Sequence, residues 1–163
     1  MENKKEAAQN IIQSNAFFAA AAGAIPIPAV DVGAVTLVQL DMLKALCRIY
    51  SVNYSEIKGK AVISALSGSI MARYWASAIK ATPGLGTLIG GISMSLMSGA
   101  NTYSLGKVFD HLLSQYGSLD NFNLEEIRKV FREELSRGKE LIKKKQEEDK
   151  KKASNADQDQ DMV

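Results

Sequence analysis

The stretch GAIPIPAVDVGAVTLVQLDML, residues 23–43, interrupts an alanine-rich segment and then resumes an apolar one. Two prolines separated by one residue lie inside it, and each disfavours helical conformation in the residue before it. Gly23 readily adopts the left-handed conformation that ends helices. The sequence therefore predicts a rigid extended corner between two helices, built on the motif Ile25, Pro26, Ile27 and Pro28.

The helix after this corner is predicted over residues 28–50. Pro28 suits a first turn, where its missing N–H costs nothing, and Asp31 places an anion near the positive end of the helix dipole. At about 100° per residue, Gln39 falls near the centre of the apolar face, where a buried amide needs hydrogen-bond partners. Two interpretations stay open: a capped helix with a satisfied core amide, or a polar pocket at Asp31 and Gln39 that receives a ligand or a partner's loop.

Helical periodicity covers most of the chain, and no convincing strand is indicated. The composition is 46% hydrophobic but only 7% aromatic, so a core must be built from Ala, Leu, Ile, Val and Met. At 163 residues the chain is long enough for one domain with a substantial core. The predicted fold is all-α, with five helices over residues 3–22, 28–50, 55–81, 84–117 and 123–144.

The third and fourth predicted helices carry rows of small residues at four-residue spacing. Such rows have no bulk, so that two backbones can approach closely, as in membrane helix pairs. Glycine inside a soluble helix costs about 1 kcal/mol relative to alanine, so its repeated use needs a reason. We therefore expect these two helices to form a central, tightly packed hairpin. The residues expected to make the contact are Ser64, Gly68, Ala72, Ala76, Gly86, Gly90, Gly91, Ser95 and Gly99.

A membrane-spanning hairpin is the alternative explanation of these rows. Residues 81–106 hold no charged side chain and are long enough to span a bilayer. However, most of them are Gly, Ser, Thr, Ala, Asn or Pro, and Arg73 lies inside the third helix, where a charge at mid-bilayer costs at least a few kcal/mol. Soluble packing is the simpler interpretation, and peripheral contact with a membrane surface stays open.

The residues of common catalytic and metal sites are scarce. Cys47 and His111 are single, which excludes an intramolecular disulfide and the usual zinc ligand sets. The run GLGTLIGG lacks the Lys and Ser/Thr of a phosphate loop, and no strand precedes it. A net charge of +2 without clustered basic and aromatic residues does not indicate nucleic-acid binding. We expect no enzymatic activity, no metal and no cofactor.

The ends of the chain are polar. Polar residues interrupt the N-terminal apolar run, so no secretory signal is expected. After residue 142 the apolar pattern stops, and the sequence predicts a single helical domain at residues 1–142 with a charged, disordered tail at residues 143–163. The expected localisation is cytoplasmic, with association at the inner membrane.

The motif IPIPAVD, followed by LVQLDMLKALCRIYSV, resembles the bacterial domain of unknown function 697 family, which includes YcjF-like proteins. The matching residues are Ile25, Pro26, Ile27, Pro28, Asp31, Gln39, Met42, Leu43 and Tyr50. EcsC-type proteins share a similar element. The resemblance implies an all-helical domain found alone, beside or fused to small Ras-like GTPases and associated with membranes. Ser51 stands where the family usually has Gly, so this helix end is less typical of it.

Three functional interpretations follow. The leading one is a non-enzymatic helical interaction module that docks through its hairpin on a protein partner, a small GTPase domain, or on a membrane surface. The second is a ligand-binding or enzymatic bundle with its site at Asp31 and Gln39. The third is a homo-oligomeric structural protein, or a two-span membrane protein, that uses the small-residue rows.

Overall fold

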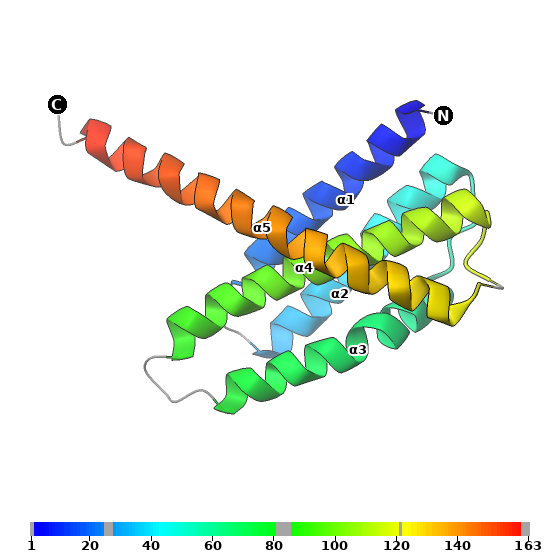
Figure 1. Cartoon of the computed structure of the whole chain (residues 1–163), viewed down its shortest axis with the longest axis horizontal. Helices are drawn as coiled ribbons and strands as arrows, with labels where there is room; N and C mark the ends of the chain where they lie inside the picture. The colour runs from blue at the N-terminus through cyan, green and yellow to red at the C-terminus, as the bar shows by residue number, and fades with distance from the viewer. Residues whose placement is uncertain (1, 25–27, 81–85, 121, 161–163) are drawn as a thin grey trace.

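The computed structural model describes residues 2–24, 28–80, 86–120 and 122–160, with side chains at 3–24, 33–68, 94–120 and 122–155. Five α-helices account for nearly all of them, and no strand occurs among the described residues. The all-α prediction is confirmed, and the first four helices begin and end within a few residues of the predicted positions (Figure 1). The helices are α1 (Glu2–Ala22), α2 (Pro28–Tyr50), α3 (Glu56–Lys80), α4 (Gly86–Gln115) and α5 (Leu124–Gln160).

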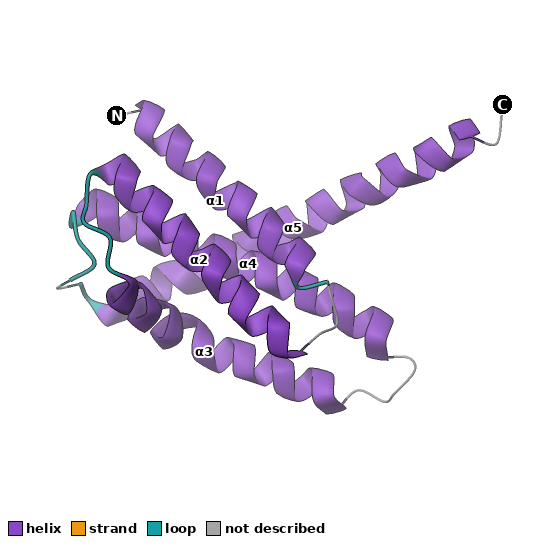
Figure 2. Ribbon diagram, turned by 180° about the vertical axis from the view of Figure 1, so that it is seen from behind, coloured by secondary structure: helices purple, strands orange, loops and turns teal. Residues whose placement is uncertain are grey.

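The central element is α4, which lies between α5 on one side and α1 with α2 on the other (Figures 1 and 2). Between residues 94 and 106 every residue except Leu96 is buried. A helix enclosed on all sides cannot carry charge without a large desolvation cost, which explains the uncharged composition of this segment. The largest fully buried apolar side chains around it are Ile12, Met42, Leu43, Leu46, Leu105, Phe109, Leu112, Ile127 and Ile142.

The glycines of α4 allow α1 and α5 to approach, rather than α3. A Cβ placed on Gly99 would lie 2.8 Å from the Cβ of Ala20 in α1 and 2.8 Å from Cδ1 of Ile142 in α5. On α3, Ser64 and Gly68 are exposed, and nothing lies within 4 Å of a Cβ built on Gly68. At Ser64, Gly68 and Gly99 the predicted contact between the α3 and α4 rows is therefore corrected, because Gly99 is covered by α1 and α5 instead.

The structure describes the side-chain surroundings of one further position in the predicted rows, Ser95. Ser95 is buried beside Gly99, as expected for a packing position. The side-chain surroundings of Ala72, Ala76, Gly86, Gly90 and Gly91 lie outside the described residues.

The corner between α1 and α2 depends on a close approach at Gly23. Its N–H donates to the carbonyl of Ala19 at 2.9 Å and ends α1. A Cβ here would lie 2.5 Å from Oγ of Ser98, so only glycine fits against α4 at this place. Pro28 is the first residue of α2, as predicted. Ile25, Pro26 and Ile27 lie outside the described residues.

The end of α2 has the geometry that usually calls for glycine. Ser51 has a φ of 58°, and the N–H of Val52 donates to the carbonyl of Cys47 at 2.9 Å. This is the left-handed closure of a helix C-terminus. The family-like glycine conformation is thus kept although the residue is serine.

Asn123 caps α5: its Oδ1 accepts from the N–H groups of Glu125 and Glu126, at 2.9 and 3.4 Å. Ile142 is the last buried residue of this helix. The helix nevertheless continues to Gln160, whereas the sequence analysis expected disorder after residue 142. We call residues 143–160 the arm.

Candidate functional site

Gln39 is buried, as its position on α2 predicts, with 2% of its surface exposed. Its Nε2 donates to Oγ1 of Thr102 in α4 at 3.1 Å. The side chain of Asp31 lies outside the described residues. Among the described residues, Gln39 serves the core by linking α2 to α4.

Further polar side chains line the buried face of α4. Oγ of Ser95 donates to the carbonyl of Ala20 at 2.6 Å and accepts from Nε2 of Gln146 at 2.9 Å. Ser104 donates to the carbonyl of Ala100 at 2.7 Å. A serine hydroxyl is small enough to donate to a nearby backbone carbonyl and still permit close helix packing. Sequence reasoning found the small residues but not these bonds, which depend on which helices meet.

The two ends of the bundle differ in charge. Residues 7–40 contain one charged residue, Asp31, and residues 61–106 contain two, Arg73 and Lys80. The second half of α1, the first half of α2, the second half of α3 and the first half of α4 come from these segments and share one end of the molecule (Figure 1). We call this the low-charge end.

Large apolar side chains are exposed at the low-charge end. Phe18 of α1 is 63% exposed and Leu37 of α2 is 65% exposed, on two helices that pack together. Exposed Leu and Phe residues are common singly, but here they occur on segments of α1 and α2 that are poor in charge, and the nearby charged group is Lys145 of α5, whose Nζ lies 6.0 Å from the ring of Phe17. The other strongly exposed apolar residue, Ile57, lies at the opposite end among Glu56, Lys58 and Lys60.

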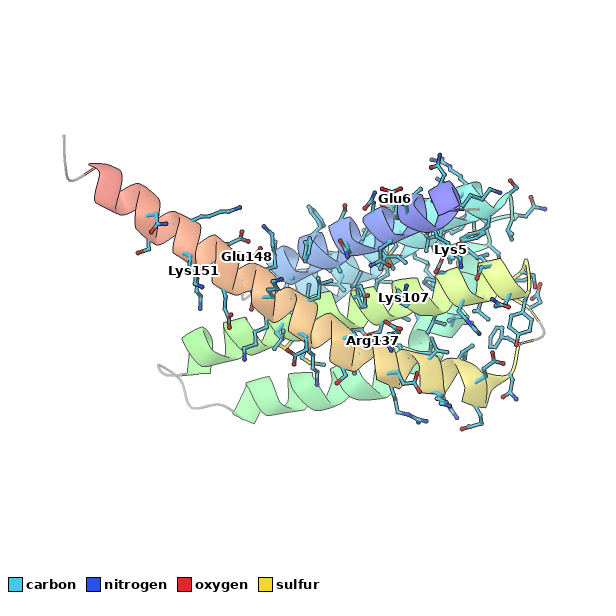
Figure 3. All side chains as sticks on the ribbon, turned by 45° about the horizontal axis from the view of Figure 1, so that its top comes forward. Lys5, Glu6, Lys107, Arg137, Glu148 and Lys151 are labelled. Atoms are coloured by element: carbon cyan, nitrogen blue, oxygen red, sulfur yellow. The ribbon has the colours of Figure 1, made fainter. Side chains whose placement is uncertain are left out.

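A groove of about 1020 Å³ lies at the opposite, charged end. Side chains from the start of α1, the end of α2, the last turns of α4 and the first turns of α5 line it. Figure 3 shows Lys5, Glu6 and Lys107 close to one another at this end. The charged residues of the groove are Lys4, Lys5, Glu6, Lys107, Asp110 and Glu134, with His111 beside them.

Opposite charges in this groove are not paired with each other. Among the described residues, no ion pair links Lys4, Lys5 or Lys107 to a carboxylate. Lys107 instead donates from Nζ to Oε1 of Gln9 at 3.1 Å. Ion pairs do occur elsewhere on the surface, for example between Lys60 and Glu56. The groove therefore presents both signs of charge to solvent.

Two carboxylates in the groove are partly buried and hydrogen-bonded, and one of them has an oxygen without a partner. Asp110 accepts a hydrogen bond from the hydroxyl of Tyr50 at 2.5 Å. Burial of Tyr50, and then this bond, raise the pKa of Tyr50 to about 12. Glu134 is 8% exposed, and its Oε1 accepts from Arg137 at 2.6 Å. Its Oε2 is buried without any partner. Such an atom costs free energy until a donor reaches it.

A further carboxylate, Glu126 at the start of α5, is hydrogen-bonded to side chains from the end of α4 and the residue that follows it. Glu126 accepts from the hydroxyl of Tyr116 at 2.7 Å and lies 2.8 Å from Nε2 of His111. The Tyr116 hydroxyl and then the His111 ring lower the pKa of Glu126, because both favour its charged form. This contact between His111 of α4 and Glu126 of α5 carries no sequence signal, because it depends on how the two helices meet.

The described residues offer little for catalysis. Cys47 is buried, and burial raises the pKa of its thiol, which disfavours the reactive thiolate. No three His, Cys, Asp or Glu side chains of the described set are placed to hold a metal ion. In the same set, no helix has both the length and the apolarity that crossing a bilayer requires.

Comparisons with known proteins place the chain in a family. Residues 1–140 match the family described as "Domain of unknown function (DUF697)". The chain is also similar to "Magnetosome membrane protein 22" of Magnetospirillum gryphiswaldense, with 30% identity over 142 residues that cover 84% of this chain and 73% of the relative. No solved structure matches.

Proposed function

The chain belongs to the domain of unknown function 697 family, and we propose that it is a non-enzymatic helical module that works at a membrane surface. It contacts the bilayer through the low-charge end, and a protein partner binds it on another surface. The expected place is the cytoplasmic side of the inner membrane. The similar magnetosome protein, which is named as a membrane protein, supports a membrane setting.

The observation that carries this proposal is the division of charge along the bundle. The segments of α1 to α4 that form this end hold three charged residues in nearly half of the chain, so these segments lose little charge hydration on contact with a bilayer. Phe18 and Leu37 supply apolar surface there, and burying each contributes about 1–2 kcal/mol at these exposed fractions. Contact of this kind is peripheral and reversible.

A protein partner is the second half of the proposal. The family resemblance implies a small GTPase domain as the partner class, and this chain has no nucleotide-binding motif of its own. The absence of an activated nucleophile among the described residues supports a non-catalytic role. An enzymatic site at Asp31 and Gln39 is less well supported, because the Gln39 amide is engaged with Thr102.

Vesicle flotation with phosphatidylethanolamine and phosphatidylglycerol tests the membrane contact. Replacing both Phe18→Ser and Leu37→Ser should reduce the bound fraction at least about tenfold, since about 2–3 kcal/mol of apolar transfer is lost. Ile57→Ser is the matched control, because Ile57 is even more exposed, at 83%, but lies at the charged end.

The outcome that contradicts the proposal is clear. If the double variant and the Ile57→Ser control float with vesicles to the same extent as the unchanged chain, the low-charge end is not the membrane contact. If the unchanged chain does not float at all, peripheral membrane binding is wrong. Circular dichroism confirms that the exposed substitutions leave the helices intact.

A further inference from the structure

Beyond Gln146 the described side chains of the arm have no contact with the rest of their own chain. From residue 147 to residue 155 every described residue is exposed, and the last contact with the bundle is the bond from Gln146 to Ser95. Isolated helices of about 12–15 residues are marginal in water, and most helical stability comes from packing against another element. The helix continues to Gln160 all the same. Its stability therefore calls for a further contact.

The arm carries both signs of charge within two turns. Residues 147–149 are Glu, Glu and Asp, and residues 150–152 are three lysines. At a rise of about 1.5 Å per residue, the centres of these two groups are about 4.5 Å apart along the helix. One face of such a helix can engage cations and anions that lie side by side.

The groove has the complementary arrangement. Lys4, Lys5 and Lys107 face it without a carboxylate partner among the described residues, and Glu6 and Asp110 face it without a cationic partner. The buried Oε2 of Glu134 lacks a donor, which an arm lysine would supply. Unpaired lysines and carboxylates thus lie around a buried carboxylate oxygen that lacks a donor, and this combination marks the groove as a place for an outside charged segment.

The arm of a chain does not reach its own groove. Figure 3 places Lys5, Glu6 and Lys107 toward one end of the long axis, and Glu148 and Lys151 on the arm toward the other end. Figures 1 and 2 show the same separation, with the arm directed away from the start of α5. The occupant is therefore a segment of another molecule.

We propose that the arm of a second copy of this chain docks in the groove, so that two molecules exchange arms in a two-fold dimer. A reciprocal exchange closes the assembly, since each copy supplies one arm and one groove. The contact is electrostatic, which makes the dimer weaken steeply with salt. The small-residue rows take no part in it.

Sedimentation equilibrium of the full chain at about 50 mM and about 500 mM NaCl tests the proposal. We expect a dimer at low salt that dissociates at least about tenfold more readily at high salt. Replacing Lys4→Glu with Lys5→Glu should weaken the low-salt dimer at least about tenfold, and Glu147→Lys with Glu148→Lys should do the same. All four side chains are exposed, so folding is retained.

The chain with all four substitutions is the decisive variant, because its charges are swapped on both surfaces and its dimer should recover. Lys44→Glu with Arg48→Glu, exposed on α2, has the same net-charge change as the lysine pair and should leave the dimer unchanged. A chain that stays monomeric at low salt overturns the proposal. So does a dimer in which the groove and arm variants behave like the α2 control, or an arm that proves necessary for vesicle binding and irrelevant to dimerisation.

Discussion

Nε2 of Gln39 in α2 donates to Oγ1 of Thr102 in α4 across 3.1 Å, and both side chains are almost completely buried. The bond joins the helix after the proline corner to the central helix. A buried donor that loses its acceptor keeps its desolvation cost without the bond. The pair therefore fixes the relative position of two helices more than it adds net stability.

Thr102→Val should lower the free energy of unfolding by about 1–3 kcal/mol, because the shape is kept while the Gln39 donor is left alone. The double change Gln39→Leu with Thr102→Val should cost less than the sum of the two single changes, with a coupling of about 1 kcal/mol. Urea unfolding of the four chains measures this cycle. Additive effects would show that the two side chains do not depend on each other.

The small residues of α3 and α4 should respond in opposite ways. Gly99→Leu should destabilise the chain by about 2–3 kcal/mol. A Cβ added at this position would lie 2.8 Å from the Cβ of Ala20 and 2.8 Å from Cδ1 of Ile142, and leucine adds further atoms. Gly68→Ala should stabilise it by about 0.5–1 kcal/mol, since this exposed helical position has open space around it. Thermal unfolding compares the two. A loss of stability in Gly68→Ala would indicate that Gly68 makes a close helix contact, contrary to the open space around it in the structure.

Sequence reasoning located Gln39 correctly because helical angle alone assigns a residue to a face. It could not supply the partner, since Thr102 lies 63 residues away and many hydroxyls on α4 were equally suitable. The same limit explains Gly99. A four-residue repeat of small side chains indicates close approach, but a surface without bulk fits any neighbouring helix, and the chain topology decides which helix arrives.

The groove could not be predicted in this way. Lys5, Lys107 and Glu134 each look like an ordinary charged residue on an amphipathic helix. Only the packing of α1, α4 and α5 brings them to one place, and only there does the missing partner of Glu134 become visible. The helical continuation into the arm was also missed, because composition alone favours disorder for so polar a segment.

Ser51→Gly should stabilise the chain by about 1 kcal/mol, because serine at a φ of 58° pays the steric cost of the left-handed region and glycine does not. Gly117 has a φ of 62°, so Gly117→Ala should lower stability by a similar amount. Chemical unfolding of both variants gives the comparison. A Ser51→Gly chain that is no more stable than the unchanged chain would contradict the prediction for the end of α2.

Tyr50 should make the chain less stable at alkaline pH. Its pKa is raised to about 12 in the folded chain, from the ordinary value of 10.0, by burial and by the bond to Asp110. The folded state therefore holds the phenolic proton more tightly than the unfolded state. The resulting stabilisation is complete below pH 10 and is lost as the pH rises toward 12. Tyr50→Phe should reduce the slope of unfolding free energy against pH in this window, with the remaining slope due to the other tyrosines. Urea unfolding at a series of alkaline pH values measures the slope, and ultraviolet titration of tyrosinate locates the ionisation. If the slope is the same in both chains, the Tyr50 proton is not held by the fold.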